Sequence, residues 1–87
     1  MNFSVYILKS EVADVYYIGS TQNVQERLKL HNSSKARWTK RYQPWVLEYY
    51  EEYTTRSEAV MREKYFKSLK GIRRKLELLK ATDINES

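Results

Sequence analysis

Two tyrosines, an arginine, a histidine and a glutamate have the chemistry that cleavage of a phosphodiester bond requires. They are Tyr6, Tyr17, Arg27, His31 and Glu63. Such cleavage needs a cation that stabilises charge on the phosphate, a group that orients or deprotonates water, and usually a metal ion bound by carboxylate oxygen. The set contains each part, and we expect the five side chains to lie near one face of a sheet.

Arg27 and His31 are four residues apart in a predicted helix that spans residues 23–32. They flank the apolar line through Val24 and Leu28. An unpaired buried charge costs several kcal/mol, so a guanidinium beside a core must be paired or must face a cleft. One interpretation extends Arg27 past the core edge to an acidic neighbour. The other turns it toward a substrate.

Glu63 shares the apolar stripe of a second predicted helix with Ala59 and Phe66. Carboxylates are rarely buried unless they are paired or bound to a metal ion. A salt bridge to Lys67 or Lys70 is the structural interpretation, and a metal ligand is the functional one.

The segments that position these residues follow from the sequence pattern. Strands are predicted at residues 3–8, 15–19 and 45–53, which are rich in aromatic and β-branched side chains. Tyrosine is ordinary in such runs, so Tyr6 or Tyr17 alone would be interpreted as core. Helices are predicted at 23–32, at 55–70 and, as a short final helix, from 72. The order β-β-α-β-α-α indicates an α+β fold with helices covering one face of a small three-stranded antiparallel sheet.

Capping signals mark the helix boundaries. Asn23 with Glu26, and Thr55 with Glu58, have the spacing of capping boxes, and Gly71 is the predicted C-cap of the second helix. Residues 31–44 lack periodicity and are predicted to form a loop. We expect residues 1–80 to form one domain and the polar residues 81–87 to form a flexible tail.

The charge of the chain is uneven. Lys and Arg outnumber Asp and Glu by 16 to 11, and residues 27–44 contain basic side chains but no acidic one. This asymmetry indicates an anionic partner, most commonly nucleic acid, although a basic surface kept for solubility is the alternative. The candidate phosphate contacts are Lys35, Arg37, Lys40 and Arg41.

Two aromatic residues of the same loop, Trp38 and Tyr42, can stack on exposed bases. The alternative is that both pack the loop against the sheet. Cysteine is absent, and no run approaches the roughly 20 apolar residues of a membrane span. The sequence therefore favours a cytoplasmic protein without a membrane partner.

The motifs resemble the GIY-YIG endonuclease superfamily, in particular small single-domain bacterial proteins related to the N-terminal nuclease domain of a bacterial excinuclease. The resemblance starts with "SVYIL" and "YYIGSTQNVQERLKLHN", where ten residues separate the two tyrosines. It continues through "ARWTKRYQPWVLEYYEE" and "SEAVMREKYFKSL". Ser4 and Val5 replace the glycine and isoleucine of the first tripeptide, and the late asparagine of the family has no clear counterpart.

The resemblance implies a role for each candidate residue. Tyr6 and Tyr17 are similar to the two active-site tyrosines, with Tyr17 in the position more often assigned to water activation. Arg27 resembles the arginine that contacts the scissile phosphate. His31 resembles a histidine that serves as the general base or assists a tyrosine. Glu63 is similar to the glutamate that holds one divalent metal ion, here Mg²⁺ or Mn²⁺. Lys67 can stand in for the asparagine and contact the nucleic acid.

Three functions remain open on these grounds. The first is a metal-dependent DNA endonuclease that acts on structured or damaged DNA in repair or recombination, directed by a targeting protein. The second is a nucleic-acid-binding module that keeps the fold without cleavage. The third is a basic domain that binds a protein partner.

Overall fold

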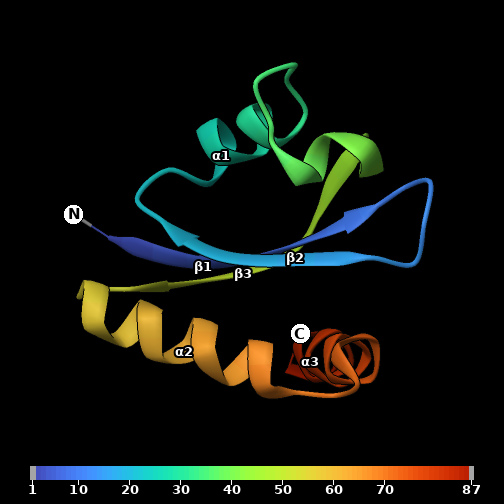
Figure 1. Cartoon of the computed structure of the whole chain (residues 1–87). Coiled ribbons are helices and arrows are strands. Elements are labelled where there is room, and N and C mark those ends of the chain that lie inside the picture. The colour runs from blue at the N-terminus through green and yellow to red at the C-terminus, as the bar shows by residue number, and fades with distance from the viewer. Residues whose placement is uncertain (1, 87) are drawn as a thin grey trace.

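The computed structural model describes the backbone of residues 2–86 and the side chains of residues 2–80. It contains a three-stranded antiparallel sheet and three α-helices, which confirms the predicted α+β fold (Figure 1). The elements are β1 (Phe3–Ser10), β2 (Tyr16–Thr21), α1 (Val24–His31), the 3₁₀ helix η1 (Trp38–Tyr42), β3 (Trp45–Tyr53), α2 (Arg56–Ser68) and α3 (Ile72–Glu86). The segment predicted as a loop therefore includes a short helix, η1.

Strand β1 lies at the centre of the sheet, in the order β2-β1-β3. Both of its neighbours are antiparallel to it, and Tyr6 is the partner of Gly19 on β2 and of Tyr50 on β3. Successive side chains of a strand point to opposite faces. Val5 and Ile7 therefore lie on one face, and Tyr6 lies on the other.

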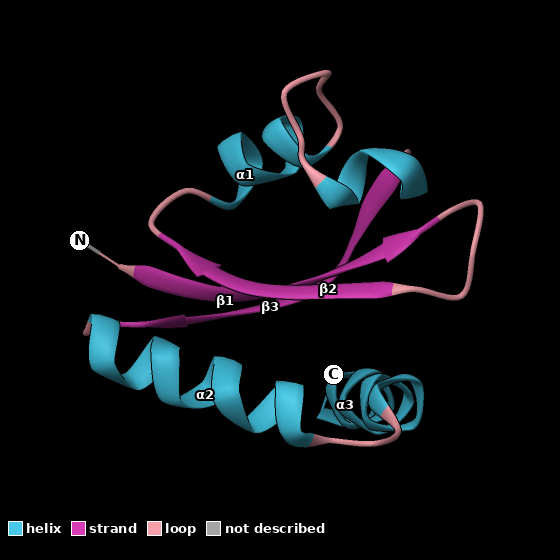
Figure 2. Ribbon diagram, viewed as in Figure 1, coloured by secondary structure: helices cyan, strands magenta, loops and turns pink. Residues whose placement is uncertain are grey.

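Helices cover both faces of this sheet, whereas the sequence predicted one covered face (Figure 2). On one face, α2 and α3 pack Ala59, Phe66 and Leu76 against β1. On the other face, α1 and the segment around η1 enclose Tyr6, Leu8 and Trp45. The reason is that β1 is apolar on both sides, so each side needs its own cover.

Both predicted helix starts are confirmed. Asn23 accepts a hydrogen bond from the Glu26 amide at 3.1 Å, and Thr55 accepts one from the Glu58 amide at 3.2 Å. The predicted C-cap at Gly71 is wrong. Helix α2 ends at Ser68 because its C-cap residue is already extended, and the Gly71 carbonyl instead accepts the Lys75 amide at the start of α3.

The last helix continues beyond the predicted domain boundary, because α3 extends from Ile72 to Glu86. The side chains of residues 81–87 lie outside the described part of the structure, so the flexible tail at 81–87 stays a prediction. Within the described residues, no helix combines the length and the hydrophobicity needed to cross a lipid bilayer.

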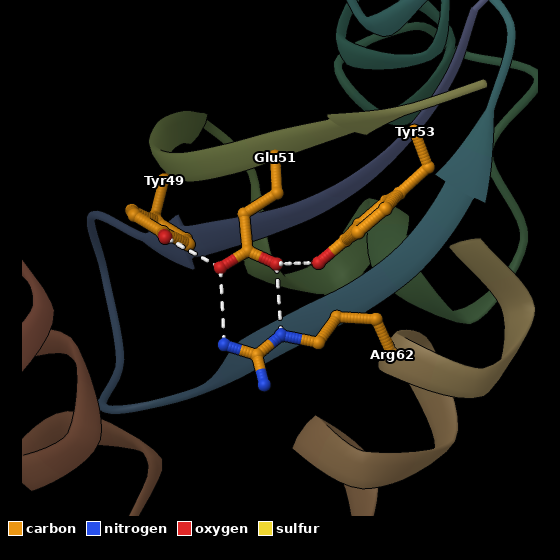
Figure 3. A network of polar contacts seen from close by, with 4 residues as sticks. All are labelled: Tyr49, Glu51, Tyr53 and Arg62. Carbon is orange, nitrogen blue, oxygen red and sulfur yellow. Dashed lines mark hydrogen bonds and ion pairs between the residues drawn. The ribbon is translucent and has the colours of Figure 1, made fainter. Parts of the chain in front are cut away.

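A carboxylate network fastens α2 to the sheet (Figure 3). Arg62 on α2 donates to both oxygens of Glu51 on β3, at 2.8 and 3.1 Å. Tyr49 and Tyr53 each donate to Glu51 at 2.5 Å. Burial is the largest single influence and raises the pKa of Glu51, but hydrogen bonds from Arg62 and the tyrosines outweigh it, so the net pKa is lowered. The ionised carboxylate is thus hydrogen-bonded on both of its oxygens.

Candidate active site

The side chain of Tyr6 extends from β1 over the edge strand β2 and passes close to Gly19. A Cβ atom on Gly19 would lie 2.6 Å from the Tyr6 hydroxyl oxygen and 2.8 Å from the ring carbon that carries it. Real Cβ atoms essentially never make contacts this short. Gly19 is therefore required by the close approach of a tyrosine, not by an unusual backbone angle, because no glycine of the described chain has a positive φ.

The second tyrosine joins this contact to helix α1. The rings of Tyr6 and Tyr17 are stacked, with centroids 6.1 Å apart. The Tyr17 ring also lies 4.3 Å from the ring of His31, at an angle of 52°. Strand pairing and the cap at Asn23 thus bring side chains from β1, β2 and α1 to one place.

His31 is buried and held at both ring nitrogens. Its Nε2 lies 3.3 Å from the Tyr6 hydroxyl, and its Nδ1 lies 3.2 Å from the Thr39 hydroxyl. Burial lowers the pKa of His31, and the positive charge of Arg27 lowers it further. The imidazole is therefore neutral at neutral pH, with one nitrogen protonated and the other able to accept a proton.

Thr39 is a site residue that the sequence did not reveal. It is buried in η1, and its carbonyl accepts a hydrogen bond of 2.9 Å from the Trp45 indole. The segment had no periodicity to show that Thr39 faces inward. The signal that could have found it is its place between two tryptophans, in a stretch that can cover the tyrosines.

Arg27 lies one helical turn before His31 and lacks the acidic neighbour that one interpretation required. Among the described residues no carboxylate pairs with it, and its buried Nε atom has no hydrogen-bond partner. Interaction with the Tyr6 hydroxyl is the largest influence and raises the pKa of Arg27. The guanidinium is charged, and one of its N–H donors has no hydrogen-bond partner. Most buried polar groups in proteins do have a partner.

Glu63 approaches the same point from the opposite face, which corrects the expectation of a single face. It lies on α2, and its carboxylate accepts a bond of 2.6 Å from Lys67. Burial is the largest influence and raises the pKa of Glu63, but hydrogen bonds from Lys67 and Ser20 outweigh it and leave the pKa lowered. Its charge also acts on Tyr6. The two faces thus meet at the edge of β2, beside Gly19.

A cleft of about 280 Å³ opens above His31 and is bordered by basic residues. Tyr17, Arg27 and His31 line it from one side, and the segment 35–39 lines it from the other. This segment supplies the predicted contacts Lys35, Arg37 and Trp38. The predicted contacts Lys40 and Arg41 are exposed on η1 but do not line the cleft.

The comparison with protein families decides what this arrangement belongs to. Residues 2–76 match the family described as the GIY-YIG catalytic domain. The chain belongs to the GIY-YIG family. This confirms the resemblance drawn from the sequence, and membership indicates a nuclease-type function with nucleic acid as the substrate.

Relatives of this GIY-YIG protein are found in Clostridium and Bacillus species. The chain is 38% identical over 87 residues to the UPF0213 protein CPE1444 of Clostridium perfringens. This match covers 99% of this chain and 90% of the relative. The chain is 44% identical over 54 residues to the UPF0213 protein BLi00048/BL00536 of Bacillus licheniformis. This match covers 61% of this chain and 56% of the relative. The second match therefore spans just over half of that relative.

A solved structure shares the fold. The solution NMR structure of the UPF0213 protein BH0048 from Bacillus halodurans matches with a TM-score of 0.55 and 35% identity. The match covers 94% of this chain and 85% of the other. The α+β fold found here is thus that of a UPF0213 relative.

The donor groups of this GIY-YIG site fit one kind of metal ion. Glu63 supplies one ionised carboxylate beside the Ser20 hydroxyl, and the described residues contain no cluster of three or more His, Cys, Asp or Glu side chains. Zinc sites normally need three or four such ligands. Magnesium prefers oxygen and usually keeps several water molecules alongside one or two carboxylates. The donors present therefore fit a divalent cation that prefers oxygen ligands.

Proposed function

We propose that this chain is a metal-dependent DNA endonuclease that hydrolyses phosphodiester bonds. The observation that carries the proposal is the buried Arg27 Nε, a charged donor without a partner. The Arg27 side chain lines the cleft together with the neutral His31 and Tyr17, and it also interacts with Tyr6. A phosphate oxygen is the partner that such a donor lacks.

Arg27 would bind the scissile phosphate. Its guanidinium offers planar donors that match phosphate oxygens, and it carries its charge before the substrate arrives. The extra negative charge that forms on the phosphate during attack is then stabilised by a group already in place. Tyr17 lines the same cleft and would orient the attacking water.

His31 would accept the proton of that water. If Nδ1 donates to Thr39, then Nε2 is the acceptor and faces the Tyr6 hydroxyl at a distance of 3.3 Å. That hydrogen bond is long, and such bonds in free enzymes are readily exchanged for one to a reactant. Burial raises the pKa of Tyr6, so this phenol keeps its proton and acts as the group that positions His31.

Glu63 would hold the metal ion, with Ser20 beside it. A bound Mg²⁺ or Mn²⁺ ion supplies a positive charge that polarises the phosphate and stabilises the leaving oxygen. In the free protein Glu63 is paired with Lys67, so Lys67 must release the carboxylate and can then contact the nucleic acid. We further propose structured or damaged DNA as the substrate and a separate protein that directs the nuclease to it in the cytoplasm.

The second candidate is a nucleic-acid-binding module that does not cleave. The Glu63–Lys67 ion pair favours it, because a carboxylate that stays paired with a lysine holds no metal ion. Such a module would still use the basic rim of the cleft to bind phosphates.

Cleavage assays distinguish the two candidates. Wild-type protein and Glu63→Gln are incubated with labelled duplex, flap, four-way-junction and single-stranded DNA, with Mg²⁺, Mn²⁺ or EDTA, and the products are resolved on a denaturing gel. Glu77→Gln, on the exposed surface of α3, is the matched control. The nuclease predicts metal-dependent cuts by the wild type and the control that Glu63→Gln lacks. Binding without cuts by all three proteins would establish the binding module.

A further inference from the structure

Trp38 lies at the mouth of the cleft in contact with other aromatic rings, although it is not part of the core. Its side chain is 54% exposed, whereas the other tryptophan, Trp45, is 2% exposed. The Trp38 ring contacts Tyr42 and Trp45 edge-on, with centroids 6.0 and 6.5 Å away. It also lies 5.8 Å from the ring of Tyr17. Burial does not explain Trp38, but its neighbours fix its orientation.

The two aromatic residues of the basic segment differ in this respect. Tyr42 packs against the core of Tyr6, Leu8 and Trp45, as the structural alternative required. Trp38 lines the cleft with its exposed surface. Of the two, only Trp38 thus presents an exposed aromatic surface next to the candidate catalytic groups.

The charges around Trp38 complete a site for a nucleotide. Lys35 and Arg37 border the same cleft, both are exposed, and no carboxylate in the described part of the chain is paired with either. An aromatic platform between free cations is the combination that binds a base by stacking and its flanking phosphates by charge. Arg27, the proposed contact of the scissile phosphate, lines the same cleft.

From this geometry we infer that the cleft between α1 and η1 binds one unpaired nucleobase adjacent to the scissile phosphate, with Trp38 as the stacking surface. The inference rests on the proposed nuclease function and narrows its substrate. A base in a matched duplex is stacked between its neighbours and must leave the helix to reach Trp38, which costs free energy. Single strands, flaps and mismatched sites offer such a base without that cost.

Tryptophan fluorescence tests the site without requiring cleavage. In EDTA, the wild type is titrated with a single-stranded thymidine oligonucleotide and with a matched hairpin duplex of equal length. We expect the single strand to quench the fluorescence of Trp38 and to bind about tenfold more tightly than the duplex. Trp38→Ala should weaken single-strand binding by about tenfold, and Trp38→Phe should retain most of the affinity.

Two controls separate stacking on Trp38 from the general loss of an exposed aromatic ring and from loss of the fold. Tyr50→Ala removes an aromatic ring that is 50% exposed on β3, and it should change the affinity by less than about twofold. Circular dichroism of Trp38→Ala and Trp38→Phe shows whether the fold is kept. Should Trp38→Ala fail to fold, the absence of quenching in the wild type would by itself overturn the inference.

Cleavage assays then keep this inference apart from the proposed function. Metal-dependent cutting of matched duplex and single strand at equal rates, unaffected by Trp38→Ala, would leave the nuclease intact and overturn the nucleobase site. Quenching and single-strand preference without any metal-dependent cut would overturn the nuclease and leave a base-binding site. Preferential cutting next to an unpaired nucleotide, reduced by Trp38→Ala, supports both.

Discussion

On the α2 face of the sheet, Glu51 accepts hydrogen bonds on both of its oxygens from Arg62 and two tyrosines. On the α1 face, Arg27 lies beside two tyrosines and keeps a buried nitrogen without a partner. Both faces therefore place an arginine among phenols at the sheet. Only on the α2 face is this arginine paired with a carboxylate, that of Glu51.

This difference separates a structural network from a candidate binding site. Breaking an ion pair whose members are hydrogen-bonded destabilises the fold because it leaves a charge without a partner, whereas a buried donor that already lacks a partner costs free energy until a ligand arrives. The α1 face bears that cost next to a cleft, a neutral histidine and a basic rim. We therefore expect substitutions on the α2 face to affect stability and those on the α1 face to affect activity.

The largest expected effect is on cleavage by Arg27→Met. This substitution keeps the length of the side chain and removes the guanidinium, so the rate of cleavage should fall by about 10²- to 10³-fold. The free energy of unfolding should change by less than about 1 kcal/mol, since no satisfied interaction with a carboxylate is lost. Gel-based rates and urea unfolding measure the two quantities. A large loss of stability would show that Arg27 is structural.

The same substitution on the other face should have the reverse result. Arg62→Met leaves Glu51 ionised and partly buried without its cation, so the free energy of unfolding should fall by about 2 kcal/mol. The rate of cleavage, measured well below the melting temperature, should stay within about twofold of the wild type. Equal stability of Arg27→Met and Arg62→Met in urea would contradict the distinction between the faces.

A smaller effect is expected for Thr39→Val, which removes the hydroxyl that holds Nδ1 of His31. The imidazole should then rotate more freely, and cleavage should slow by about tenfold. Thr39→Ser restores a hydroxyl at the same place and should recover most of the rate. Failure of the serine variant to recover it, although folded, would assign Thr39 a packing role alone.

The smallest effect is a change of stability at alkaline pH. Burial, with the adjacent Glu51 carboxylate, raises the pKa of Tyr53 from 10.0 to about 12. The folded state holds this proton more tightly than the unfolded chain, so the resulting stability is present below pH 10 and is lost as the pH rises toward 12. Tyr53→Phe should lose less stability over this interval in urea unfolding. An identical decline in both proteins would disprove the contribution of Tyr53.

Much of the fold could be predicted from the sequence because its signals are local. The order of strands and helices, the caps at Asn23 and Thr55, and the helix that places Arg27 and His31 one turn apart all follow from neighbouring residues. The end of α2 and the 3₁₀ helix η1 differ from the sequence prediction. In both places packing against the sheet decides the backbone, and short-range propensity does not report it.

The candidate catalytic residues themselves could be predicted from the sequence. Each of Tyr6, Tyr17 and Arg27 lies in a segment whose type the pattern gives, and spacing predicts that they gather. Their roles stay predictions. The partner of Glu63 was among the alternatives that the sequence left open, and the structure selects Lys67.

By itself, then, the sequence determined the element types, the helix starts, the basic segment and the set of groups able to act on a phosphate. The tertiary structure decided which of them are satisfied. It alone shows that Glu51 is paired with Arg62 and that the Nε atom of Arg27 has no hydrogen-bond partner. It also shows that Glu63 approaches the candidate site from the opposite face, beside Gly19. The physical reason is that hydrogen-bond satisfaction depends on distances between segments remote in the chain, which local patterns do not encode.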